Sequence, residues 1–240
     1  MKRFIKRVFL VLFTIILIGG SFLVYKGYRE YKNVVAENSI ETVVASIQNK
    51  KHYTRNEDIN PLFLEAVVAT EDERLYSRST VLDYRALGRA FVKNITTFSL
   101  AEGGSTIPQQ VAKNLYFPNN FTATRKVAEY FIASDLDKLY SREEILELYV
   151  NMNYYGDGHH GIREASFGYF NVNPKDMSRA QAVMLAGIPQ SPAYYQLSSN
   201  YKGAKARQEH VLYRLVDAGV ITQEEAISIF NEDVYGGNNE

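Results

Sequence analysis

The chain has no cysteine and no tryptophan among its 240 residues. Without cysteine there can be no disulfide, no thiol nucleophile and no thiolate metal ligand, which is compatible with a bacterial surface protein. Neither sign of charge is in excess, because 27 Lys and Arg residues balance 27 Asp and Glu residues. A balanced chain with no long basic stripe beyond its first residues argues against a nucleic-acid-binding protein.

Alternation of apolar and polar residues with a period of two never extends beyond a few residues, which argues against a large sheet. Helix signals are frequent instead. Three Ser/Thr-x-x-Glu/Gln capping boxes each predict the start of a helix; they pair Ser141 with Glu144, Ser178 with Gln181, and Thr222 with Glu225. His159 and His160 are adjacent and would diverge on a helix, so we expect no zinc site there. The predicted fold class is all-α.

Residues 8–25 form one uncharged apolar run of 18 residues, near the shortest length that spans a hydrocarbon core of about 30 Å. Basic residues in segment 1–7 predict a cytoplasmic N-terminus, with the remainder of the chain outside the membrane. A cleavable signal peptide is the rival interpretation. The run is longer than a usual signal-peptide core and no small-x-small cleavage site follows it, which favours a membrane anchor.

The expected organisation follows from this anchor. Residues 1–7 are a cytoplasmic basic tail, 8–25 a transmembrane helix, 26–59 a polar connector and 60–235 one domain. Roughly 210 residues beyond the anchor are enough for one sizeable core with a smaller lobe.

Segment 103–114, GGSTIPQQVAKN, gathers small and hydrogen-bonding residues where a core helix would have aliphatic ones. The glycines allow the backbone to approach a ligand closely, and Ser105 and Thr106 are candidate donors or helix caps. Gln109, Gln110 and Lys113 follow, with Asn114, at spacings that can share a helical face. The segment is either a polar binding site or a glycine-rich turn capping a solvated helix.

A second candidate lies at the end of a predicted helix that starts with Asn60 as N-cap and Pro61 at its first position. Glu71 and Asp72 end its apolar stripe. A carboxylate beside apolar residues is partly desolvated, which raises its pKa toward values useful for a general base. The alternative is a solvated helix end helped by Arg74.

A third candidate is the pair Arg125 and Glu129 on a predicted helix that runs from a Thr124 cap to about Tyr140. The buried stripe of this helix comprises Ala128, Phe131, Ile132, Leu136 and Leu139. Arg125 and Glu129 are four residues apart on another line. They form either an ordinary surface ion pair worth a few tenths of a kcal/mol or a cation and a carboxylate of a site.

These segments together resemble the peptidoglycan glycosyltransferases of family 51, found in membrane-anchored monofunctional transglycosylases and at the N-terminal end of bifunctional penicillin-binding proteins. The resemblance covers about residues 60–222. It rests on five motifs in order: ATEDERLY, GGSTIPQQVAKN, RKVAE, EILELYVNMNYYG and LAGIPQSPAYY. It implies a lysozyme-like, all-α, bilobed domain with a smaller membrane-associated jaw, preceded here by one transmembrane helix.

Residue by residue, the resemblance implies that Glu71 is the general base and Glu129 a second essential carboxylate. Thr106, Gln110, Lys113 and Arg125 match positions that line the donor and pyrophosphate side. The implied reaction polymerises lipid II into β-1,4-linked glycan strands at the outer face of the cell membrane and releases undecaprenyl diphosphate. The implied partners are lipid II, the growing lipid-linked strand, the membrane and other cell-wall synthesis proteins.

No dedicated metal ligands are visible, so Mg²⁺ or Mn²⁺ is expected to arrive with the substrate diphosphate. No organic cofactor is expected. The chain ends at Glu240 without a Ser-x-x-Lys region that would begin a transpeptidase domain, so we expect cross-linking to be the task of another protein.

The sequence departs from the family after the base. The usual motif continues from Glu-Asp to Phe, His and Gly before an Asp, whereas this chain has Leu75, Arg78 and no glycine. The loop SRSTVLD is one residue longer before Asp83, and Pro108 stands where a threonine is usual. We expect a different loop geometry, and a misplacement of about 1 Å can cost about 100-fold in rate.

Two other functions remain open at this stage. A lysozyme-like hydrolase or lytic transglycosylase would also suit a helical fold with a catalytic glutamate. Lys113 and Arg125 argue for the synthetic reaction, because glycan cleavage has no diphosphate leaving group to stabilise. A catalytically degenerate membrane scaffold is suggested by the altered loop, but both glutamates and the cations are retained.

Overall fold

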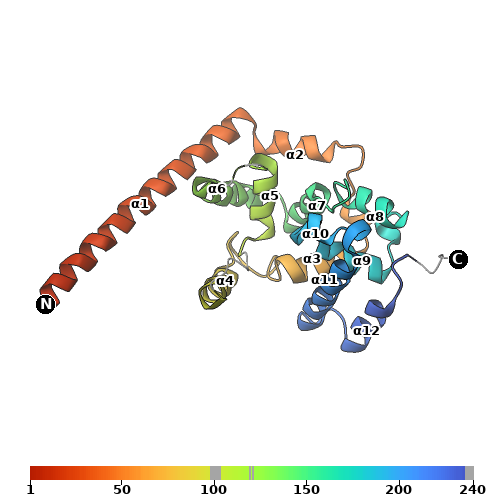
Figure 1. Ribbon diagram of the computed structural model, residues 1–240. Coiled ribbons are helices and arrows are strands. Elements are labelled where there is room, and N and C mark those ends of the chain that lie inside the picture. The colour runs from red at the N-terminus through yellow and green to blue at the C-terminus, as the bar shows by residue number, and fades with distance from the viewer. Residues whose placement is uncertain (98–103, 119, 121, 236–240) are drawn as a thin grey trace.

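The computed structural model describes residues 1–97, 104–118, 120 and 122–235 (Figure 1). Its helices are α1 (Lys2–Glu37), α2 (Ile40–Gln48), α3 (Pro61–Glu71), α4 (Tyr84–Thr97), α5 (Ile107–Tyr116), α6 (Ala123–Leu139), α7 (Arg142–Met152), α8 (Ile162–Phe170), α9 (Arg179–Gly187), α10 (Pro192–Tyr195), α11 (Leu197–Asp217) and α12 (Gln223–Asn231). Short 3₁₀ helices η1 (Asn56–Asp58), η2 (Pro174–Asp176) and η3 (Ile188–Gln190) lie between them.

The all-α prediction is confirmed, since the described part of the chain has one isolated β-bridge, Tyr154–His160, and no strand. All three predicted capping boxes are present, at the starts of α7, α9 and α12. Asn60 caps α3 by accepting from the backbone N–H of Leu62 at 2.9 Å. A fourth capping box, formed by Thr106 and Gln109, begins α5. Local sequence therefore sets where most of these helices begin.

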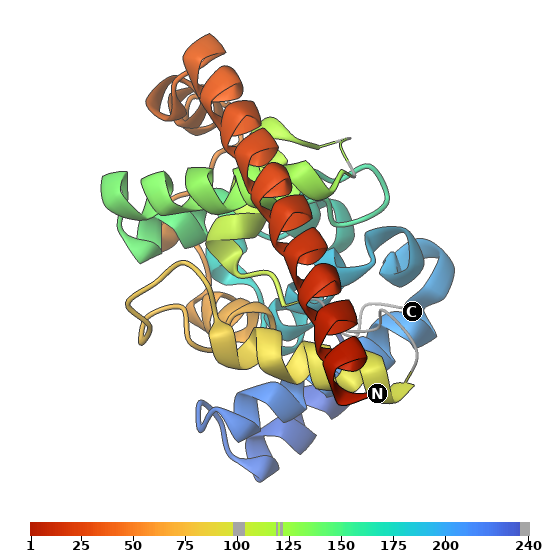
Figure 2. The ribbon, with the colours of Figure 1, turned by 90° about the vertical axis from the view of Figure 1, so that its left-hand side faces the viewer.

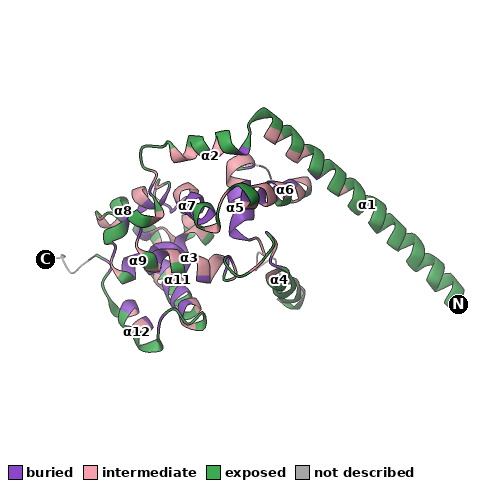
Figure 3. Ribbon diagram, turned by 180° about the vertical axis from the view of Figure 1, so that it is seen from behind, coloured by how far each residue is buried: buried purple, intermediate pink, exposed green. Residues whose placement is uncertain are grey.

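The larger lobe is built around α9, whose residues from 180 to 187 are all buried (Figure 3). Helices α3 and α11 pack against it. A smaller lobe contains α5 and α6, which pack on each other. Helix α4 lies apart from the larger lobe in Figure 1. Helix α7 joins the two lobes, since it contacts α5 and α6 and also α8, which packs on α9. This division agrees with the expected larger lobe and smaller jaw.

Helix α1 projects away from the rest of the chain in Figure 1 and crosses in front of it in Figure 2. It contains the apolar run and is the one described helix long and apolar enough to cross a membrane, with a mean hydropathy of 2.6 over its best window and none of that window buried. The segment expected as a connector, 26–59, holds the end of α1, all of α2 and η1. That segment therefore has regular helical structure.

Two details of α6 differ from the expectation. Its N-cap is Thr122, not Thr124, and its side chain accepts from the backbone N–H of Arg125 at 3.3 Å. The sequence Thr-Ala-Thr offers two caps in the same turn, and the entry of the chain selects the first. Leu139 is 48% exposed because it lies in the last turn, beyond the packed part of the stripe.

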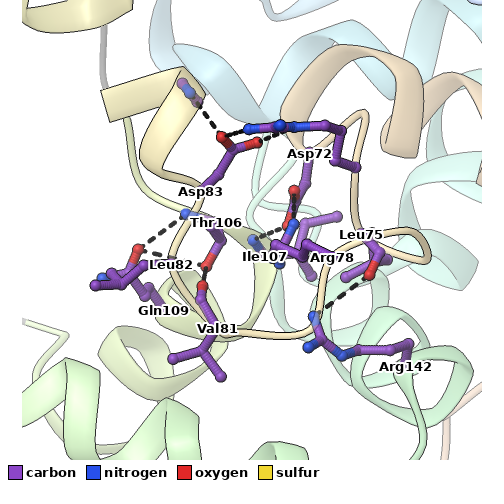
Figure 4. Close-up of polar contacts among 12 residues, drawn as sticks. Asp72, Leu75, Arg78, Val81, Leu82, Asp83, Thr106, Ile107, Gln109 and Arg142 are labelled. Carbon is purple, nitrogen blue, oxygen red and sulfur yellow. Dashed lines mark hydrogen bonds and ion pairs between the residues drawn. The ribbon is translucent and has the colours of Figure 1, made fainter. Parts of the chain in front are cut away.

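The loop after α3, residues 72–83, is fixed at one end by a buried ion pair between Arg78 and Asp72, whose side chains are 7% and 1% exposed (Figure 4). The second nitrogen of the Arg78 guanidinium donates to the other Asp72 oxygen at 2.7 Å. Asp72 also accepts from the backbone N–H of Ile107 at 2.9 Å. The end of α3 is thus joined to the first residue of α5.

The other end of this loop is held on the same turn of α5. The Thr106 hydroxyl donates to the carbonyl of Val81 at 2.8 Å, and Arg74 forms an ion pair with Asp83 (Figure 4). Leu75, where the family has phenylalanine, is fully buried. The altered loop therefore has a defined structure in which Arg78 takes part, and its effect on rate stays a prediction.

We predict that Arg78→Ala lowers the free energy of unfolding by about 3 kcal/mol, because it leaves the Asp72 carboxylate buried without its cation. Chemical denaturation of the detergent-solubilised chain measures this. The control is Arg179→Ala, which breaks the exposed pair with Glu225, 45% and 42% exposed, and should cost under about 1 kcal/mol. Equal small losses in both variants would show that the Arg78 pair does not hold the loop.

Candidate active site

A cleft of about 560 Å³ lies between the two lobes. Its walls come from the end of α3, the loop after it, α4, the start of α5, one residue of α6, η3 and α11. Its acidic and basic lining residues are Glu71, Asp72, Glu73, Asp83, Arg89, Lys113, Lys126, Arg207, His210 and Arg214. A concave, largely polar site of this size is large enough to hold a sugar and its charged substituents.

Glu71 is the last residue of α3 and faces this cleft, with 17% of its side chain exposed. The Gln110 amide donates to one of its oxygens at 3.1 Å. The Arg207 guanidinium lies 3.8 Å from the other. Arg74, the expected partner of this helix end, pairs with Asp83 instead. Glu71 is thus a carboxylate oriented by two lobes and still open to a ligand.

Helix α5 presents only part of its polar sequence to the cleft. Gln110 and Lys113 line it, as predicted. Gln109 is used differently: its side-chain oxygen accepts from the backbone N–H of Thr106 at 3.1 Å, so it caps the helix. Asn114 points elsewhere and donates to Asn153 at 3.3 Å. At 3.6 residues per turn, these four residues, spread over the six positions from 109 to 114, cannot all share one narrow face.

The turn before α5 contributes Gly104, Ser105 and Thr106 to the cleft lining, while Gly103 lies outside the described residues. A Cβ added to Gly104 would lie 2.9 Å from the side chain of Leu87, so this glycine admits α4 at close range. Thr106 is 2% exposed and its hydroxyl is engaged by Val81. Ser105 is the more accessible hydroxyl, and it accepts from Lys126 at 3.0 Å.

On α6 the structure places Lys126 at the cleft, rather than Arg125 or Glu129. Glu129 has no exposed side-chain surface and lies 2.6 Å from the Lys126 ammonium and 2.9 Å from the Arg125 guanidinium. The predicted ion pair of Arg125 and Glu129 is therefore present, but neither residue lines the cleft. This differs from the expectation that both line the site, because the packing of α5 on α6 buries their edge of the helix.

Helix α11 supplies two arginines and a histidine that sequence reasoning missed. Arg207, His210 and Arg214 line the cleft opposite α5. Arg207 is held by donating to the carbonyl of Gly187 at 3.2 Å, and Arg214 by Glu73 at 2.9 Å. Their spacing of three and four residues, on a helix, was the available signal. Opposite walls of the cleft therefore both carry positive charge.

Burial lowers the pKa of two of these groups. Desolvation lowers the pKa of the Lys113 ammonium below its ordinary value, and the carboxylate of Glu129 only partly opposes this. Desolvation likewise lowers the pKa of Arg207, against the attraction of Glu71. A desolvated cation interacts strongly with an anion that enters beside it, since the local dielectric is low.

The residues present do not form a metal site. Within the described ranges, no group of three or more His, Asp or Glu side chains is placed to hold a metal ion. The side of the cleft formed by α5 and α6 presents ammonium groups, which do not coordinate metals. That a divalent ion arrives with the substrate stays a prediction.

Comparison with known proteins assigns the family. The family model described as transglycosylase matches residues 37–216. Penicillin-binding protein 1A of Neisseria gonorrhoeae is 36% identical over 188 residues, 78% of this chain and 23% of that protein. Penicillin-binding protein 1F of Bacillus subtilis is 33% identical over 238 residues, 95% of this chain and 33% of that protein.

The aligned part is thus about a quarter to a third of each relative. A crystal structure of penicillin-binding protein 1A from Haemophilus influenzae is similar at a TM-score of 0.46 and 19% identity, covering 76% of this chain and 17% of that one. The residues that the family model matches include Glu71 and Glu129, helices α5 and α6, α11 up to residue 216, and the loop of residues 72–83. The chain therefore belongs to the transglycosylase family.

Proposed function

We propose that this protein is a membrane-anchored peptidoglycan glycosyltransferase that polymerises lipid II into β-1,4-linked glycan strands and releases undecaprenyl diphosphate, with Glu71 as general base. The observation that carries the proposal is one cleft in which a solvent-accessible carboxylate lies among desolvated and half-buried cations. Transfer from a diphosphate-linked donor needs both kinds of group.

Glu71 would accept the proton of the acceptor sugar's 4-hydroxyl. The freed oxygen attacks the anomeric carbon of the donor, the bond from that carbon to the diphosphate oxygen breaks, and its electron pair leaves with the diphosphate. Because attack and departure are in line, the anomeric configuration inverts. Gln110 and Arg207 hold the Glu71 carboxylate in place without closing it to the acceptor.

Lys113 and Lys126 would stabilise the charge that develops on the departing diphosphate. Glu129 has no access to the cleft, so we assign it to positioning: it keeps the Lys126 ammonium at the wall and balances its charge. Arg125 supports this arrangement from behind. Buried ion pairs of this kind fix geometry at the expense of desolvation.

The two arginines of α11, Arg207 and Arg214, supply a second positive wall. Arg207, His210 and Arg214 lie across the cleft from Lys113 and would bind the anionic part of the second lipid-linked substrate. A polymerase that joins two diphosphate-carrying molecules must neutralise two diphosphates. A glycan-cleaving enzyme has neither, so the two walls favour synthesis over the hydrolytic alternative.

The anchor follows from α1, which is apolar and has no buried residue over 8–25. We propose that it crosses the cell membrane once with its N-terminus in the cytoplasm, since Lys2, Arg3, Lys6 and Arg7 precede the apolar run. The cleft then lies outside the cell membrane, where lipid-linked precursors and other cell-wall synthesis proteins would meet it.

We predict that Glu71→Gln lowers the rate of lipid II polymerisation by about 100-fold or more, because the amide cannot take the proton. Labelled lipid II and gel analysis of the product measure this. Glu65→Gln, an exposed position on the same helix, is the matched control and should retain activity.

Polymer formed by Glu71→Gln at the parent rate would refute the assignment of the base. Shortening of preformed glycan strands by the parent would favour the lytic enzyme instead. A folded parent that binds strands but makes no polymer would favour the scaffold. The altered loop suggested that function, but the buried ion pair of Arg78 and Asp72 gives the loop a defined structure.

We predict that kcat/KM falls on the alkaline side at a lower pH than an ordinary lysine would give. The Lys113 ammonium is charged only below its pKa, and burial lowers that pKa. Lys113→Arg should move the fall to higher pH, since a guanidinium stays charged. Lys175→Arg, exposed and outside the cleft, should leave the profile unchanged; an identical profile for Lys113→Arg would contradict the assignment.

A further inference from the structure

The second half of α1 does not project freely but packs along α6. Gly27 is buried, while the rest of α1, all of which is described, is partly or fully exposed. A Cβ at position 27 would lie 2.4 Å from the Cβ of Val127 and 2.7 Å from the backbone oxygen of Thr124. Any side chain there would push the two helices apart. Gly19 and Gly20, earlier in α1, have open space around them.

Aromatic and polar contacts between α1 and α6 continue beyond Gly27. The ring of Phe131 lies 5.1 Å from Tyr28 and 5.5 Å from Tyr31, measured between centroids. The Tyr31 hydroxyl donates to Asp135 at 2.5 Å. Gly27 and Tyr31 on α1 are four residues apart, as are Val127, Phe131 and Asp135 on α6, so the contacts repeat at about one helical turn.

The end of α1 is also tied to α5. The Tyr116 hydroxyl, in the last turn of α5, donates to the backbone carbonyl of Asn38 at 2.8 Å. Asn120, between α5 and α6, donates to Glu30 at 2.9 Å. Helix α1 therefore contacts both helices whose other faces carry Lys113 and Lys126. Figures 1 and 2 both show the end of α1 beside α5 and α6.

We propose that residues 27–38 form a rigid joint between the anchor helix and the cleft, and that the close approach at Gly27 fixes it. The anchor and the cationic wall then move as one body, so the membrane sets the height and tilt of the cleft directly. A lipid-linked substrate is held by the same membrane. Its diphosphate therefore meets Lys113 and Lys126 at a defined height. This consequence for catalysis rests on the proposed function, whereas the joint itself does not.

Spin labels test the joint without any activity. The chain has no cysteine, so nitroxides can be attached only at introduced sites, Phe22→Cys on α1 and Ile227→Cys on α12, which are 58% and 54% exposed. The full chain is reconstituted in phosphatidylethanolamine and phosphatidylglycerol vesicles, and the distance distribution is measured by pulsed electron paramagnetic resonance. We expect one narrow distribution. Gly27→Leu should broaden or shift it, and Gly20→Leu, the matched control, should not.

A broad distribution in the unaltered joint, or the same distribution for Gly27→Leu and Gly20→Leu, would overturn the proposal. Polymerisation of vesicle-borne lipid II is the second readout. Gly27→Leu should lose about 10-fold or more, since a displacement of about 1 Å can cost about 100-fold. Gly20→Leu should be unaffected. Tyr31→Phe, which removes only the hydroxyl, should give a smaller change in the same direction.

The two readouts separate the two ideas. An inactive parent with a narrow distance distribution would refute the proposed function and keep the joint. An active Gly27→Leu with a broadened distribution would keep the glycosyltransferase and refute the claim that the joint sets its rate. If Gly27→Leu lost activity without any change in the distance distribution between the spin labels, the joint would not be the cause of the loss.

Discussion

The hydrogen bond from the backbone N–H of Ile107 to the Asp72 carboxylate is the contact on which the cleft depends. It joins the helix that ends at Glu71 to the helix that begins beside Thr106. One carboxylate thereby satisfies a free N–H at the start of α5 and, through Arg78, orders the intervening loop. Glu71, the residue before Asp72, is thereby placed within reach of Gln110 on α5.

Charge in the cleft is arranged in two tiers. The outer tier consists of groups that line the cleft, including Lys113 and Lys126. The inner tier consists of buried or paired groups that keep the outer groups in place. Glu129 belongs to the inner tier, since it lies wholly inside and contacts two cations. This arrangement lets cations stay close together before any anion arrives, because the carboxylate behind them reduces their mutual repulsion.

The smaller lobe packs on α1 as well as on its own helices. Helices α5 and α6 pack on each other and on α7, and α1 covers a further face of α6. A helix that would otherwise be only an anchor therefore takes part in the fold. The feature that permits this is the smallest side chain at the crossing, because only glycine leaves room for two backbones to meet.

The sequence by itself determined the all-α class, three capping boxes, the Asn60 cap, the apolar run and Glu71 at a helix end. Hydrogen bonds within one turn and residue spacing fix these features locally. It also predicted one shared face for Gln109, Gln110, Lys113 and Asn114, of which only Gln110 and Lys113 line the cleft. Only the tertiary structure decided that Gln109 caps a helix, that Glu129 lies behind Lys126, and that α11 faces Glu71 with Arg207. The reason is physical: which face of a helix meets a ligand depends on what packs against its other faces, and those partners come from distant parts of the chain.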